Sequence, residues 1–115
     1  MTIDILREIS SKLKGTTEDI KWEDHLCFNV GAKMYLITTL EGDPTNATFK
    51  VPEEDFDEMC SREGFTKAPH LGRYFWVMIE DISKLTRKEW EHFINQSYSL
   101  VASKLPKKTK QEIGL

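Results

Sequence analysis

The sequence contains few cysteines and no long hydrophobic run. Its 115 residues include two cysteines, Cys27 and Cys60, which lie on different predicted elements. They are spaced too widely for a metal-binding or redox motif, so both are expected to be buried free thiols. No stretch approaches the ~20 apolar residues that a membrane helix needs. Residues 1–5 lack the basic and apolar pattern of a secretory signal. A single cytoplasmic domain over residues 1–115, without membrane contact, is therefore expected.

Motifs that carry catalysis or bind metals are also scarce. The serines of the predicted helices are not flanked by the glycines of a nucleophile elbow. His25 and His92 have no ligating residue four positions away. The acidic stretch from Glu53 to Glu58 lacks the alternating ligands and the central glycine of a calcium-binding loop. We therefore expect no metal, no cofactor and no enzymatic activity.

Charge is unevenly distributed along the chain. The 16 lysines and arginines and 19 acidic residues give a net charge of −3. Residues 41–63 hold eight acids and two basic residues. Several of these acids fall in the first turn of a predicted helix, where negative charge interacts favourably with the helix dipole. Residues 104–110 contain no acid and four lysines: Lys104, Lys107, Lys108 and Lys110. This locally basic tail could contact phosphates.

The periodicity of apolar residues predicts three helices and five strands. The first helix covers residues 3–14, with Thr2 as its N-cap and Gly15 at its end. A polar link over residues 16–24 follows. A short helix opens after Pro52 and ends at Gly64. The predicted strands are residues 25–30, 33–40, 47–51, 65–68 and 73–80.

The last helix has the clearest signals of all the elements. Thr86 and Glu89 match a capping box, and Leu85 and Trp90 hold the N′ and N4 positions of a hydrophobic staple. The staple places Trp90 in the core. Pro106 ends this helix, and residues 107–113 are expected to form one or two further turns.

The Gly31-Ala32 loop between the first two strands predicts a type II′ hairpin turn, because glycine comes first in a two-residue connection. One face of this hairpin would carry the pairs Val30–Lys33, Phe28–Tyr35 and Leu26–Ile37. The opposite face would carry Cys27, Asn29, Met34, Leu36 and Leu40. Both faces are partly apolar, so either the chain's own ends or a partner is expected to cover the second face.

The segment 68–79 combines a turn with an aromatic-rich strand. Residues 69–72 predict the turn. In the strand, Tyr74, Trp76 and Met78 alternate with Phe75, Val77 and Ile79. Both faces are thus apolar, which is typical of a central strand. Trp76 is expected in the core, with stacking against a base or ligand as the alternative, and Trp22 in the polar link is expected to be exposed.

Three groups of residues, read in order, resemble the MmcQ/YjbR family of small bacterial proteins. They are the hairpin Val30-Gly31-Ala32-Lys33-Met34, the segment Pro69-His70-Leu71-Gly72-Arg73 with Trp76-Val77, and Ser97-Tyr98 with Leu100-Val101 and Lys104 to Lys108. The resemblance implies an α+β, two-layer, secretion-chaperone-like fold, α-β(3)-α-β(2)-α, with an antiparallel five-stranded sheet in the order 1-2-3-5-4. The family is often labelled DNA-binding because its shape has been likened to a double wing.

Three kinds of function remain open. The first is DNA binding through basic residues of the last helix, the tail and the hairpin turns, namely Lys33, Lys67, Arg73, Lys104, Lys107, Lys108 and Lys110. An acidic pI of about 5.6 counts against it. The second is a protein-interaction or dimerising module that uses an apolar sheet face. The third is binding of a small anionic ligand near His70 and Arg73. The residues expected to contact such a ligand or partner are Trp22, Tyr35, His70 and Arg73.

Overall fold

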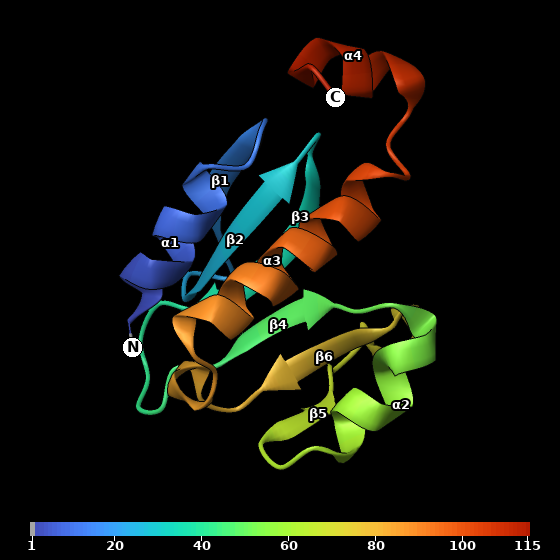
Figure 1. Cartoon of the computed structure of the whole chain (residues 1–115). Coiled ribbons are helices and arrows are strands. Elements are labelled where there is room, and N and C mark those ends of the chain that lie inside the picture. The colour runs from blue at the N-terminus through green and yellow to red at the C-terminus, as the bar shows by residue number, and fades with distance from the viewer. Residues whose placement is uncertain (1) are drawn as a thin grey trace.

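A computed structural model describes residues 2–115 as an α+β fold. The helices are α1 (Ile3–Ser11), α2 (Glu53–Ser61), α3 (Arg87–Ala102) and α4 (Lys107–Ile113). The strands are β1 (Thr16–Lys21), β2 (His25–Val30), β3 (Lys33–Thr39), β4 (Ala47–Lys50), β5 (Phe65–Lys67) and β6 (Trp76–Ile79). Helices α1, α2 and α3 pack on one face of the sheet, where they enclose the main core, and α4 lies beyond the end of α3 (Figure 1).

The sheet has six antiparallel strands in the order β1-β2-β3-β4-β6-β5, so the expected count of five was wrong. The missed strand is β1, which lies in the segment interpreted as a polar link and pairs residue for residue with β2. Most of its side chains are exposed because it forms the edge of the sheet, and an exposed edge strand carries little apolar alternation. The other five strands keep the expected relative order.

The predicted pairing within the β2–β3 hairpin was wrong beyond its first residues. A β-bulge follows Met34, so Phe28 pairs with Leu36, and Cys27, not Leu26, pairs with Ile37. Gly31 and Ala32 both have positive φ (55° and 66°), which is a type I′ geometry and not the expected type II′. The bulge leaves both Tyr35 and Leu36 in the main core and moves Ile37 to the opposite face.

The aromatic-rich strand is shorter than predicted. Residues 72–74 form a 3₁₀ turn, Phe75 adopts a left-handed conformation with φ of 69°, and β6 begins at Trp76. The expected alternation holds within β6, whose Val77 and Ile79 enter the main core while Trp76 packs on the other face. The strand lies between β4 and β5, as expected for a central strand.

Helix α3 begins as predicted. The hydroxyl of Thr86 accepts a hydrogen bond from the backbone N–H of Glu89, and the Glu89 carboxylate accepts one from the N–H of Thr86. Both residues of the staple are buried. Helix α1 is shorter than the predicted 3–14 and ends at Ser11, and Thr2 occupies its N-cap without a side-chain hydrogen bond.

The Ser97 side chain on α3 forms hydrogen bonds to both β3 and β4, next to the last residues at which these two strands pair. Its hydroxyl donates to the carbonyl of Tyr35 at 2.6 Å and accepts from the backbone N–H of Lys50 at 3.0 Å. Ser97 is fully buried, and its hydrogen bond to the Tyr35 carbonyl is buried as well. Replacing Ser97 with alanine should lower the free energy of unfolding by about 1–3 kcal/mol, because two buried backbone groups lose their partner. Urea unfolding measures this, and an unchanged midpoint would contradict the bridging role.

An exposed ion pair connects α1 to α3. The Arg87 guanidinium donates to both carboxylate oxygens of Glu8, at 2.9 and 3.3 Å, and these hydrogen bonds lower the pKa of Glu8. A lowered carboxylate pKa favours the folded state above pH ~4.5, and this contribution is lost as the pH falls through the folded-state pKa. Unfolding curves at successive acidic pH values should therefore show a shallower decline for Glu8→Gln than for the natural protein.

Candidate functional site

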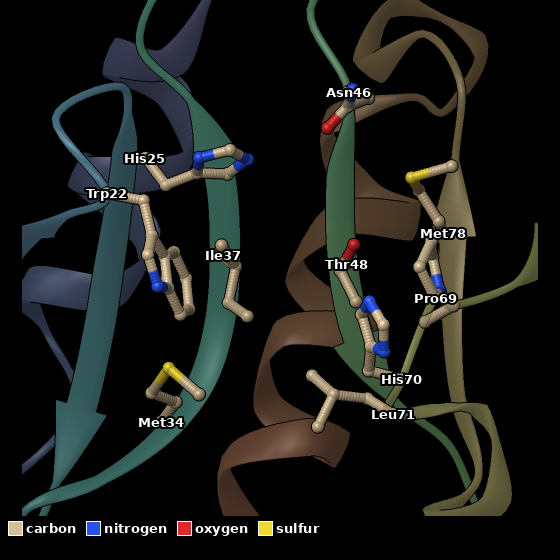
Figure 2. Close-up of a pocket in the computed structure, with 11 residues that line it drawn as sticks. Trp22, His25, Met34, Ile37, Asn46, Thr48, Pro69, His70, Leu71 and Met78 are labelled. Atoms are coloured by element: carbon tan, nitrogen blue, oxygen red, sulfur yellow. The ribbon is translucent and has the colours of Figure 1, made fainter.

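The sheet face opposite the helices carries an apolar groove of about 520 Å³. We call it the open-face groove. Its floor consists of side chains from β3, β4 and β6, namely Met34, Ile37, Thr48 and Met78. One rim is formed by Trp22 and His25, and the other by residues 68–71, with Asn46 at one end. Figure 2 shows the two rims on opposite sides of the groove.

Trp22 forms its rim from the turn between β1 and β2. Trp22 and Glu23 have φ values of 53° and 66°, a conformation that bulky residues seldom adopt. The indole is 66% exposed and packs edge-on against the His25 ring at 5.7 Å between centroids. His25 is held in turn by the Asp24 carboxylate, 2.6 Å from Nδ1. A large aromatic side chain is thus positioned beside the groove while remaining open to solvent.

The opposite rim is a tight turn that follows β5. The N–H of Gly72 donates to the carbonyl of Ala68 at 2.9 Å, and that of Leu71 donates to Pro69 at 2.7 Å. His70 has a φ of 63° and is exposed. Unusual backbone conformations of non-glycine residues often occur at binding sites, and here they occur on both rims of one groove.

A second groove of about 460 Å³ adjoins the first, and the two share Met34 and Leu71. We call it the lysine groove, because Lys33, Lys50 and Lys104 line it together with apolar and aromatic residues of β6, α3 and the turns beside them. Partial burial lowers the pKa of Lys50, and the nearby Lys104 ammonium lowers it further. Within residues 2–115, none of the three lysines forms an ion pair.

The structure gathers some of the predicted basic residues and separates others. Lys33 and Lys104 meet at the lysine groove, and the Arg73 guanidinium lies 4.8 Å from the ring centre of Tyr74, which lines that groove. Lys67 lies elsewhere, with its aliphatic stem against Gly72, where an added Cβ would be 2.1 Å from the Lys67 Cγ. Lys67 lines neither of the two grooves.

The three lysines predicted on the tail have different surroundings. Lys107 and Lys108 open α4 and are exposed. Lys110 is half-buried and donates to the backbone carbonyl of Ser103 at 2.9 Å. None of the three lines the lysine groove.

The prediction that Tyr35 contacts a ligand or partner was wrong. Its ring is fully buried, and its hydroxyl shares a hydrogen bond with the Thr16 hydroxyl at 2.9 Å. The ring packs edge-on against Tyr98, so the side chain belongs to the core. Trp22 and His70 both line the open-face groove, and Trp22 is exposed as predicted.

Sequence reasoning missed Lys50 and Met34 as members of the site. Lys50 was counted only within the acidic segment 41–63. The alternation of buried Ala47 and Phe49 with Thr48 and Lys50 could have revealed it, since alternate residues of a strand point to opposite faces. Met34 was placed on the second face, but its position between two grooves depends on strands that are distant in sequence.

No group of three histidine, cysteine or carboxylate side chains gathers as a metal site among the residues that the structure describes. Over the same residues, every helix is too short or too polar to span a bilayer.

The chain is similar to known proteins both in sequence and in structure. A family model described as YjbR matches residues 11–100. The chain belongs to the YjbR family. A Deinococcus radiodurans protein with a DUF419 domain is similar in structure, with a TM-score of 0.88 and 27% identity over 99% of this chain and 88% of its own.

A Pseudomonas syringae protein shares the YjbR-family fold, with a TM-score of 0.71 and 22% identity over 87% of this chain and 98% of its own. No curated protein matches the sequence. Residues 69–71 line the open-face groove, and residues 71–76 and 100–106 contribute side chains to the lysine groove.

Proposed function

We propose that this YjbR-family protein is a non-enzymatic binding protein that takes a small, largely apolar molecule into the open-face groove. The observation that carries the proposal is an apolar groove of about 520 Å³ beside an exposed tryptophan. Ligand pockets commonly measure about 300–1,000 Å³ and are lined by apolar and aromatic side chains with a few polar groups. Asn46 and Thr48 supply such polar groups here.

The composition of the groove favours a flexible or aromatic ligand body. Met34 and Met78 on the floor have unbranched side chains that adapt to ligands of different shape. Trp22 and His70 on opposite rims supply ring faces that can cover an apolar body. Removing such a body from water contributes about 25 cal/mol per Å² of apolar surface, which is the main source of affinity expected here.

Trp22 offers a direct test. Replacing it with alanine should weaken binding of 1-decanol on the order of tenfold, because one rim of the groove is lost. The free energy of unfolding should change by less than about 0.5 kcal/mol, since the indole is exposed. Isothermal titration calorimetry and urea unfolding measure the two quantities.

Ile20→Ala is the matched control for Trp22→Ala. Ile20 belongs to the same hairpin and is 60% exposed, but it lines a different surface, next to Arg7 and Leu26. Its replacement should leave decanol binding unchanged. If the natural protein does not bind decanol at all, the proposal fails. Dimerisation that depends on Trp22, detected by sedimentation, would assign the groove to a second copy of the chain.

DNA binding is a second candidate, favoured by the gathering of Lys33, Lys50 and Lys104 without acidic partners. Exposed Tyr74 in the same groove could stack on a base, as aromatic residues do in single-strand-binding proteins. Titration of single-stranded and duplex 20-mers at two salt concentrations tests it, because affinity from phosphate contacts falls as salt rises. Absence of binding at low salt rejects this candidate.

A further inference from the structure

The two grooves together form one extended site with two different ends. Met34 and Leu71 line both, so the two grooves meet at these two side chains. The open-face end is lined by apolar, histidine and uncharged polar side chains. The other end carries three lysines and no carboxylate among its lining residues. This asymmetry matches a ligand with an apolar part and a negatively charged part.

Within residues 2–115, the three lysines of the lysine groove form no ion pairs with acidic side chains. Lys50 is half-buried on β4, and its nearest charged influence is Lys104, another cation. Two like charges near one groove, one of them partly desolvated, are unfavourable in the free protein. A bound anion would offset this repulsion and accept charge-assisted hydrogen bonds from the ammonium groups. Burial first, and the Lys104 ammonium second, lower the pKa of Lys50.

We propose that the ligand is a free amphipathic anion, with its apolar body in the open-face groove and a carboxylate or phosphate group among Lys33, Lys50 and Lys104. This inference rests on the proposed function, because the apolar body must first occupy the open-face groove. The apolar floor of the open-face groove favours this ligand over a nucleic acid, whose phosphate backbone has no apolar body to place against Met34 and Met78. The volume of about 520 Å³ is in the range that holds one small molecule, which favours a free ligand over a membrane surface.

The test compares ligands with the same apolar body and different ends. Calorimetric titrations use 1-decanol, decanoate and decyl phosphate against the natural protein, Lys50→Met and Lys104→Met. Methionine keeps much of the apolar stem and removes the charge. The control variant is Lys108→Met, which removes an exposed lysine of α4 outside both grooves. Urea unfolding confirms that each variant is folded.

The natural protein should bind decanoate or decyl phosphate on the order of tenfold more tightly than decanol, from one charge-assisted interaction. Lys50→Met and Lys104→Met should remove most of this preference and leave decanol binding unchanged, whereas Lys108→Met should keep it. The preferred anion identifies the head group.

Equal binding of decanol and both anions would overturn the inference while leaving the proposed function intact. No binding of any of the three would overturn both. Competition by a single-stranded 20-mer for the decanoate site, with the same lysine dependence, would assign the lysines to nucleic acid instead. Equally strong, lysine-dependent sedimentation with phosphatidylglycerol vesicles would assign them to a membrane surface.

Discussion

Replacing Trp90 with alanine is expected to lower the free energy of unfolding by about 3–5 kcal/mol, the usual cost of deleting a buried tryptophan side chain. Trp90 is fully buried at the first turns of α3. Its ring packs edge-on against Phe49 of β4 at 5.5 Å, and its indole N–H donates to the carbonyl of Ile82 at 2.8 Å. Truncation would therefore open a cavity between helix and sheet and leave a buried carbonyl without its donor.

This loss is large against the 5–15 kcal/mol total stability typical of small domains. Trp90→Phe keeps much of the ring volume and removes the N–H donor together with the five-membered part of the indole, so its cost should be smaller, about 1–3 kcal/mol. Trp22→Ala provides a comparison at an exposed tryptophan. Urea unfolding followed by circular dichroism gives all three values. Similar midpoints for Trp90→Ala and Trp22→Ala would show that the α3–sheet contact does not organise the core.

The largest expected effect on binding comes from Met34→Glu. Met34 lies where the two grooves meet, so a carboxylate there would have to be desolvated by an apolar body and would repel an anionic end. Decanoate affinity should fall on the order of 100-fold, and decanol affinity should fall less. Calorimetric titration of both ligands measures the two losses.

Met34→Leu is the conservative counterpart. It preserves volume and apolar character, so affinity should stay within about threefold of the natural protein. Circular dichroism checks that both variants keep the fold, which is expected because Met34 is only half-buried. Undiminished decanoate binding by a folded Met34→Glu variant would place the ligand elsewhere.

The fold was predictable where local signals decide structure. Thr86 and Glu89 specify the start of α3 from four consecutive residues, and the hydrogen bonds of the capping box are present. Local signals fail at β1, whose pairing with β2 depends on tertiary contacts and whose polar, exposed residues lack alternation. They also fail at the bulge after Met34, since no residue type marks the position where a strand takes up an extra residue.

The candidate site was predictable only in part. Trp22 and His70 stand out in the sequence as an aromatic residue in a polar segment and a histidine in a turn, and both line the open-face groove. Lys50 and Lys104 are separated by half the chain, and only the packing of α3 against β4 brings them to one groove. Tyr35 lies on the same face as Phe28, as the predicted pairing had it, and that face is the one that the helices cover, so its ring is in the core.

The binding site itself can be mapped by ¹H–¹⁵N NMR during titration with 1-decanol. If the open-face groove binds the ligand, the indole N–H of Trp22 and the backbone amides of Met34, Thr48 and residues 70–71 should shift most. Signals of α1, on the opposite side of the sheet, should stay in place. Shifts confined to α1 and α4, or no shifts at saturating decanol, would contradict a ligand site on the open face of the sheet.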